Sequence, residues 1–144
     1  MKKTRFLPFI LLLLITGTLS AQSAETGFLN RSIPLDGVEY RYQVYVPYNY
    51  TAAEEWPVTL FLHGAGERGS DGLKQTQVGL GRAIRLNPER WQTLAVFPQV
   101  PVGESWQGVA GDVAMAALDA TIAEFSADAD RLYLTGLSLG GNGT

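Results

Sequence analysis

The amino-acid sequence predicts an α/β fold with a mostly parallel sheet, preceded by an antiparallel hairpin. Short, continuous apolar runs at residues 58–62, 94–97 and 132–134 are typical of parallel strands that are covered on both faces. Segments with helical periodicity lie between these runs, so that strands and helices alternate along the chain. A turn dipeptide at residues 36–37 separates two earlier extended segments, which indicates a hairpin before the parallel part.

The hairpin is predicted from Asp36 and Gly37, because both residues of this dipeptide can adopt the positive φ of a tight two-residue turn. Its strands are expected at residues 33–35 and 38–46. In the second strand, apolar and aromatic residues alternate with mainly polar ones, a period of two that is typical of a half-buried antiparallel strand. Pro47 is expected to end it.

The stronger helix is predicted over residues 112–126, where apolar side chains recur at about every fourth position. Asp112 lies near its start, where a negative charge interacts favourably with the helix dipole. A weaker helical pattern covers about residues 77–86, and the Asn87-Pro88 pair is expected to end it. The sequence shows no internal repeat and no second domain.

The composition is that of one globular domain: 144 residues, 46% hydrophobic and 17% charged. The net charge of −3 is scattered along the chain, so we expect no basic surface and no nucleic-acid partner. Since cysteine is absent, disulfides, thiolate catalysis and thiolate metal sites are excluded. Histidine and carboxylate residues lack metal-ligand spacing, so no metal is expected.

The first 24 residues have the pattern of an export signal peptide. Residues 1–5 are positively charged, residues 6–15 are apolar, and residues 19–24 supply small side chains for cleavage. The apolar run has about half the ~20 residues that a membrane span needs, so we expect cleavage rather than a stable membrane anchor. The mature domain, residues 25–144, is therefore expected to be secreted or periplasmic.

A Gly-x-Ser-x-Gly motif, residues 136–140, directly follows the last apolar run. In a nucleophile elbow, a sharp turn after a strand raises the serine above the sheet, and the positions two before and two after it must be small. The motif therefore predicts Ser138 as a nucleophile. The alternative is an ordinary glycine-rich turn.

A glycine-rich loop, residues 63–69, follows the first apolar run. In serine hydrolases of this architecture, the loop at that point donates one backbone N–H to the oxyanion hole, and the residue after the nucleophile donates the other. Ala65 and Leu139 are the candidates, unless the loop is a plain turn. His63, the single histidine, lies on this loop, so we expect it to order the loop by hydrogen bonding rather than to act as the base.

For several other residues the sequence leaves two possible roles open. Trp106 is a candidate wall of a pocket for an aromatic or apolar acyl group, or else a cover for the edge of the core. Glu67 and Arg68 could orient a polar substrate or form a local ion pair. Asp130 is expected to cap or to pair beside Arg131.

The chain resembles the N-terminal half of a secreted α/β-hydrolase. It is similar to feruloyl esterases, polyhydroxybutyrate depolymerases and predicted peptidases near the prolyl oligopeptidase and dienelactone hydrolase groups. The resemblance covers roughly residues 28–144 and is carried by residues 60–69, Phe97-Pro98-Gln99 with Trp106, and residues 130–141. It implies an incomplete α/β-hydrolase fold containing the N-terminal hairpin, the first parallel strands and the nucleophile elbow. It also implies the roles given above for Ser138, Ala65 and Leu139.

The resemblance implies an exported serine esterase that cleaves a small-molecule or polymer-linked carboxylic ester through an acyl-enzyme. Such acyl transfer by a serine would need no cofactor. In that family the triad acid and histidine follow the serine, whereas no Asp or His follows Ser138 here. We therefore expect a fragment whose last strand, residues 132–135, is an uncovered sheet edge, and the activity of the chain alone stays open. The alternatives are a prolyl oligopeptidase-like serine peptidase and, in another class, a non-catalytic binding module or inactive remnant.

Overall fold

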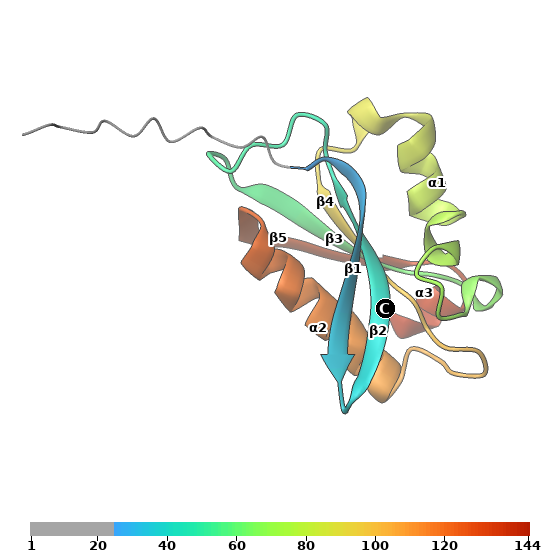
Figure 1. Cartoon of the computed structure of the whole chain (residues 1–144). Helices are drawn as coiled ribbons and strands as arrows, with labels where there is room; N and C mark the ends of the chain where they lie inside the picture. The colour runs from blue at the N-terminus through green and yellow to red at the C-terminus, as the bar shows by residue number, and fades with distance from the viewer. Residues whose placement is uncertain (1–24) are drawn as a thin grey trace, which may run out of the picture.

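The computed structural model of the protein describes residues 25–144, so the predicted signal peptide lies outside the described residues. A five-stranded mixed sheet in the order β1-β2-β4-β3-β5 carries helices on both faces (Figure 1). The strands are β1 (Gly27–Leu35), β2 (Val38–Val46), β3 (Trp56–Leu62), β4 (Leu94–Pro98) and β5 (Ala127–Gly136). The α-helices are α1 (Gly79–Leu86), α2 (Val109–Glu124) and α3 (Leu139–Gly143), and the 3₁₀ helices are η1 (Ala65–Glu67), η2 (Lys74–Thr76) and η3 (Pro88–Arg90).

The predicted hairpin is confirmed as β1 and β2, which pair antiparallel from Gly27 opposite Val46 to the turn. Asp36 and Gly37 have φ values of 49° and 79°, as a tight turn of this kind requires. The first strand is longer than predicted. Phe28 near its start packs its ring 5.2 Å from that of Tyr45, which holds the extra residues against the sheet.

The prediction that β2 is half-buried is wrong for its second half, where both faces are covered. β2 also pairs antiparallel with β4, which places it inside the sheet instead of at its edge. Tyr45 packs on the α1 side, and Gln43 is 5% exposed. The Gln43 amide donates to Asn30 Oδ1 and accepts from Thr76 Oγ1, both at 2.8 Å, so a polar residue is buried here with its hydrogen bonds satisfied.

The parallel part of the sheet consists of β4, β3 and β5, with β3 between the other two. This confirms the predicted α/β alternation. All five residues of β4 are buried. β5 lies at the edge of the described sheet, as expected, and its apolar residues Leu132, Tyr133 and Leu134 are 42%, 56% and 49% exposed.

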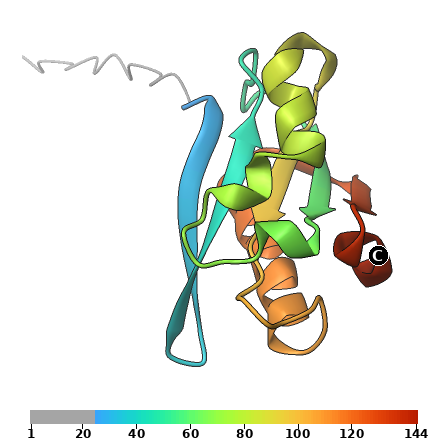
Figure 2. The ribbon, with the colours of Figure 1, turned by 90° about the vertical axis from the view of Figure 1, so that its right-hand side faces the viewer.

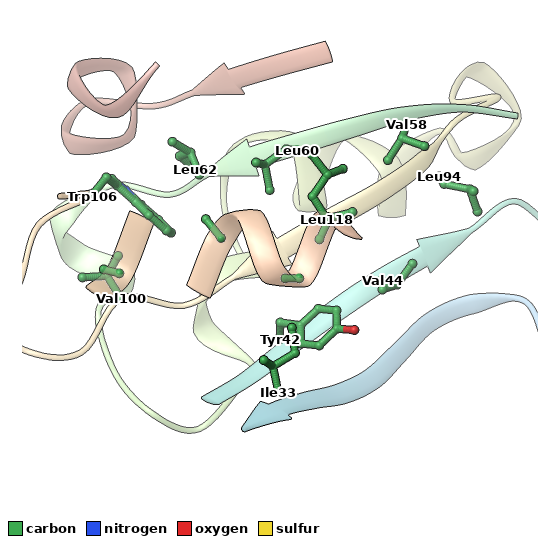
Figure 3. Packing of buried hydrophobic residues seen from close by; sticks show 14 of the residues in the cluster. Ile33, Tyr42, Val44, Val58, Leu60, Leu62, Leu94, Val100, Trp106 and Leu118 are labelled. Carbon is green, nitrogen blue, oxygen red and sulfur yellow. The ribbon is translucent and has the colours of Figure 1, made fainter. Parts of the chain in front are cut away.

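Helices α1 and α2 cover opposite faces of the sheet, each with its own apolar cluster. On one face, Leu80 and Ile84 of α1 pack with Phe61 and Phe97. On the other, α2 packs on a larger cluster from all the central strands. Figure 3 shows this second cluster, in which Leu118 of α2 lies among side chains of β2, β3 and β4.

Both predicted helices are present, with shifted ends. α2 begins at Val109, earlier than the predicted residue 112, because Gly108 takes a φ of 56° and its carbonyl accepts the Asp112 N–H at 3.0 Å. None of the helices in residues 25–144 is long and apolar enough to cross a membrane. Arg131 pairs with Asp128 at 2.5 Å, which corrects the expectation for Asp130, whose backbone N–H instead donates to Asp128.

Candidate active site

Ser138 has a strained backbone at the junction between β5 and α3, with φ 52° and ψ −111°. Such a conformation costs a residue with a side chain about 1–3 kcal/mol. A Cβ on Gly136 would collide with the Gly140 carbonyl, and a Cβ on Gly140 would collide with the Leu62 carbonyl. Both contacts involve backbone atoms, so the two glycines of the motif are required by the close approach of strand and helix.

The turn around Ser138 is attached to the end of β3. The Leu137 N–H donates to the Leu62 carbonyl at 3.0 Å, and the Gly140 N–H donates to the Leu137 carbonyl at 2.8 Å. Figure 2 shows α3 directly after the β5 arrow, beside the end of β3. The geometry is that of a nucleophile elbow at the carboxyl end of parallel strands.

The glycine-rich loop after β3 lies against this elbow. A Cβ on Gly64 would lie 3.7 Å from Ser138 Cβ and 3.5 Å from the Leu137 carbonyl oxygen. Ala65 begins η1 and Leu139 begins α3, so the amides of both predicted oxyanion donors lie at the start of a helical segment. Within residues 25–144, neither amide donates a hydrogen bond to a protein acceptor.

His63 is completely buried, and both of its ring nitrogens are engaged. The Val100 N–H can only donate, so Nε2 accepts from it at 3.0 Å, and Nδ1 carries the proton and donates to the Gly64 carbonyl at 2.6 Å. Burial lowers the pKa of His63, which favours this neutral ring. The expectation that His63 orders the loop agrees with these bonds, and no ring nitrogen is left to accept a proton from Ser138.

Trp106 packs in the core, which was one of its two expected roles, whereas its role as the wall of an acyl pocket stays a prediction. It is 7% exposed within the larger apolar cluster, and its indole N–H donates to the His63 carbonyl at 3.0 Å. It also lines a hollow of about 150 Å³ together with Leu139, Asn142 and Gly143 of α3. This hollow adjoins the elbow but is smaller than most ligand pockets, which begin at about 300 Å³.

Gln99 is a site residue whose role is not predictable from the sequence. Its side-chain amide donates to the Glu67 carbonyl at 3.0 Å, and its amide oxygen accepts the Gly72 N–H at 2.7 Å. Because it is only 4% exposed, these bonds are shielded from water and hold η1 against the loop that follows it. The Phe97-Pro98-Gln99 segment was part of the resemblance, but nothing in its pattern pointed to this contact.

Glu67 and Arg68 do not form the ion pair that was one of their expected roles. The ion pairs within residues 25–144 join Arg31 to Glu124 and Arg131 to Asp128. Arg68 instead turns inward, since its Nε is buried without a hydrogen-bond partner. In the same part of the chain, no group of three or more His, Cys, Asp or Glu residues could hold a metal ion.

Solved structures of esterases share this fold, although no family model and no curated protein matches the chain. A thermostable esterase is 30% identical with a TM-score of 0.68 over 81% of this chain and 36% of its own. A thermostable esterase from Pseudomonas putida is 31% identical with a TM-score of 0.57, over 80% of this chain and 35% of its own.

More distant structures show the same fold. The S-formylglutathione hydrolase of Staphylococcus aureus is 14% identical with a TM-score of 0.61, and the match covers 84% of this chain and 51% of that one. The chain thus spans between about a third and a half of the length of these structures. The sheet order, the elbow and these likenesses together identify residues 25–144 as an incomplete, esterase-like α/β-hydrolase fold.

Proposed function

We propose that the protein is a carboxylic ester hydrolase in which Ser138 is the nucleophile. The observation that carries the proposal is the backbone of Ser138, which is held in a strained conformation between two sterically required glycines at the end of a parallel strand. The likeness to esterases at about 30% identity favours esters as the substrate class. The chain spans 36% and 35% of those two esterases, so the activity of the whole protein is part of the proposal.

The reaction would proceed through an acyl-enzyme. Ser138 Oγ attacks the ester carbonyl carbon and gives its proton to a base, while the carbonyl oxygen becomes negative and accepts hydrogen bonds from the amides of Ala65 and Leu139. The bond to the alcohol oxygen then breaks, and the alcohol leaves with the proton. Water attacks the acyl group in the same way and frees the serine.

The base and its orienting acid are not found among the described residues. His63 uses both ring nitrogens in hydrogen bonds to the backbone of Gly64 and Val100, and the sequence has no other histidine. Loss of the histidine from a comparable triad lowers the rate by about a millionfold, whereas oxyanion donors and binding leave a residual rate. The proposal therefore includes a base and an acid beyond these residues, and it expects acylation of Ser138 in this chain to be slow.

The location of the protein outside the cytoplasm is proposed from the sequence. The pattern of residues 1–24 supports export, so the ester would be met outside the cytoplasm, as a small molecule or as part of a polymer. Neither a nucleic-acid partner nor a stable membrane anchor is included in the proposal.

Labelling with a fluorophosphonate tests the nucleophile directly. We expect Ser138 to be labelled in the unchanged chain and in Ser105→Ala, because Ser105 lines the hollow next to the elbow without sitting in the turn. Ser138→Ala should not be labelled. Ser138→Gly removes the same hydroxyl and tolerates the backbone conformation, so it covers the case in which the alanine variant fails to fold. Mass spectrometry of the intact chain and its peptides gives the readout, and equal labelling of the unchanged chain and either Ser138 variant would exclude this nucleophile.

A further inference from the structure

The Glu67 carboxylate lies beside the proposed nucleophile, and within residues 25–144 it has no hydrogen-bond or ion-pair partner. A Cβ on Gly64 would be 3.0 Å from Glu67 Oε2 and 3.7 Å from Ser138 Cβ, so the carboxylate and the serine side chain flank the same point in space. Among residues 25–144, no side chain or amide donates a hydrogen bond to this carboxylate, and no cation lies within ion-pair distance of it. Glu67 is half-buried, so its charge is partly shielded but still reachable from outside.

The backbone fixes this placement. The Glu67 N–H donates to the Gly64 carbonyl at 3.3 Å within the turn of η1, and the Glu67 carbonyl accepts from buried Gln99 at 3.0 Å. The Nε of the adjacent Arg68 is buried, and its guanidinium forms no ion pair with the carboxylate. The position of the negative charge is therefore fixed by the backbone of the same loop that contains the Ala65 amide.

A lone carboxylate at this position opposes the proposed chemistry. The carbonyl oxygen becomes negative during attack by Ser138, and a second negative charge nearby raises the energy of that state. A positive group on the substrate, placed against the carboxylate, would remove this repulsion and replace it with attraction. A negative group on the substrate would increase the repulsion.

We propose that Glu67 is a specificity-determining residue that selects esters with a positively charged group close to the scissile carbonyl and discriminates against anionic esters. This inference rests on the proposed function, since the position of the carboxylate matters to a substrate only if Ser138 is the attacking group. It assigns a substrate class to the site, cationic esters, that the likeness to known esterases does not supply.

Matched phosphonofluoridates that differ only in the charge of one side chain test the assignment. One carries a trimethylammonium group, the second an uncharged tert-butyl group of the same shape, and the third a carboxylate. In each case Ser138 Oγ bonds to phosphorus, the P–F bond breaks, fluoride leaves with the bonding electron pair, and the serine proton passes to the buffer. The second-order rate of labelling at Ser138 is measured for each probe by mass spectrometry.

We expect the cationic probe to react about three- to tenfold faster than the neutral one at low ionic strength, and the anionic probe to react more slowly than both. The preference should shrink in about 0.5 M salt. At this salt concentration the Debye length is only on the order of a few Å, so a partly exposed charge is screened. Glu67→Gln should abolish it. Glu39→Gln is the matched control, since it removes one negative charge from β2, which β4 and β3 separate from β5, and should leave the preference intact.

The experiment distinguishes failure of the Glu67 assignment from failure of the proposed function. Labelling of Ser138 at the same rate by the cationic and neutral probes, or a preference that survives in Glu67→Gln, overturns the assignment and leaves the proposed function standing. Labelling of the unchanged chain that does not exceed that of Ser138→Gly for any probe, after incubation long enough to detect a slow reaction, overturns the proposed function and this assignment with it. The ranking of the probes and its salt dependence in the unchanged chain decide the matter even if the glutamine variant does not fold.

Discussion

The His63 ring is held neutral by its surroundings, and this has a consequence for stability. Burial lowers the pKa of His63, whereas in the unfolded chain the ring titrates near its ordinary value of about 6.5. Below that pH the unfolded state therefore binds a proton that the folded state does not. The stabilisation is complete above the unfolded pKa and is lost as the pH falls below it.

We predict that the free energy of unfolding falls between pH 7.5 and 5, by at most about 2 kcal/mol. Urea unfolding at several pH values measures it. His63→Gln keeps an acceptor for the Val100 N–H but cannot titrate, so its stability should be lower throughout and nearly flat in this range. A parallel fall in both proteins would show that other groups cause the effect. Asp71 and Asp128, whose pKa values are lowered by hydrogen bonds, act only at more acidic pH.

Single residues differ in how far the sequence could predict them. The spacing of the glycines around Ser138 encodes a steric requirement, so the turn could be predicted from five consecutive residues. The contact of Gln99 with η1 joins loops more than thirty positions apart, and a glutamine that bonds to backbone leaves no pattern in its own neighbourhood. The position of Glu67 likewise depends on the fold of two loops.

At the scale of elements, the contact between α3 and β3 sets the geometry of the elbow. A Cβ on Gly140 would meet the Leu62 carbonyl, whereas a Cβ on the adjacent Gly141 would have an ordinary contact of 3.9 Å with the Gly136 carbonyl oxygen. Both glycines are in α3. Their surroundings therefore separate a packing effect from an effect of helix propensity.

We predict that Gly140→Ala lowers the free energy of unfolding by at least about 2 kcal/mol, because backbone atoms must move to admit the methyl group. Gly141→Ala, the matched control, should change it by no more than about 0.5 kcal/mol, since alanine is the better helix former and has room. Denaturant unfolding measures both variants. A loss of the same size in the two would contradict the close approach of α3 to β3.

Elements were predictable where their signal is local. The Asp36-Gly37 turn and the apolar β4 are read from adjacent residues, and both are confirmed. The burial of β2 was not predictable, because the Gln43 side chain accepts a hydrogen bond from Thr76 of η2, a partner that only the tertiary fold supplies. The position of β4 between β2 and β3 was not predictable either, because strand order depends on tertiary pairing and leaves no local signal in the sequence.

At the scale of the whole molecule, one side of the sheet is left open in the described chain. β5 is the edge strand, and Leu132, Tyr133 and Leu134 are all about half exposed. An apolar edge with free backbone groups invites pairing with another strand. At the opposite edge of the described sheet, Arg31 of β1 forms an ion pair with Glu124 of α2.

We predict that the chain self-associates through β5 in a concentration-dependent way. Tyr133→Lys should weaken this association by about fivefold, equivalent to ~1 kcal/mol, because like charges would meet across paired edges. Met115→Lys places the same charge on exposed α2 and should have no such effect. Light scattering over a dilution series measures the association. A monomer at all concentrations that melts cooperatively would contradict the prediction.

The bond from Leu137 to the Leu62 carbonyl has a mechanical consequence for the site. Leu62 ends β3 and leads directly into the loop with His63 and Gly64, so the same carbonyl marks the start of the loop and supports the elbow. A displacement of the end of β3 would therefore move both the loop and the turn around Ser138. The hydrogen bond thereby ties the position of the Ser138 turn to the start of the loop.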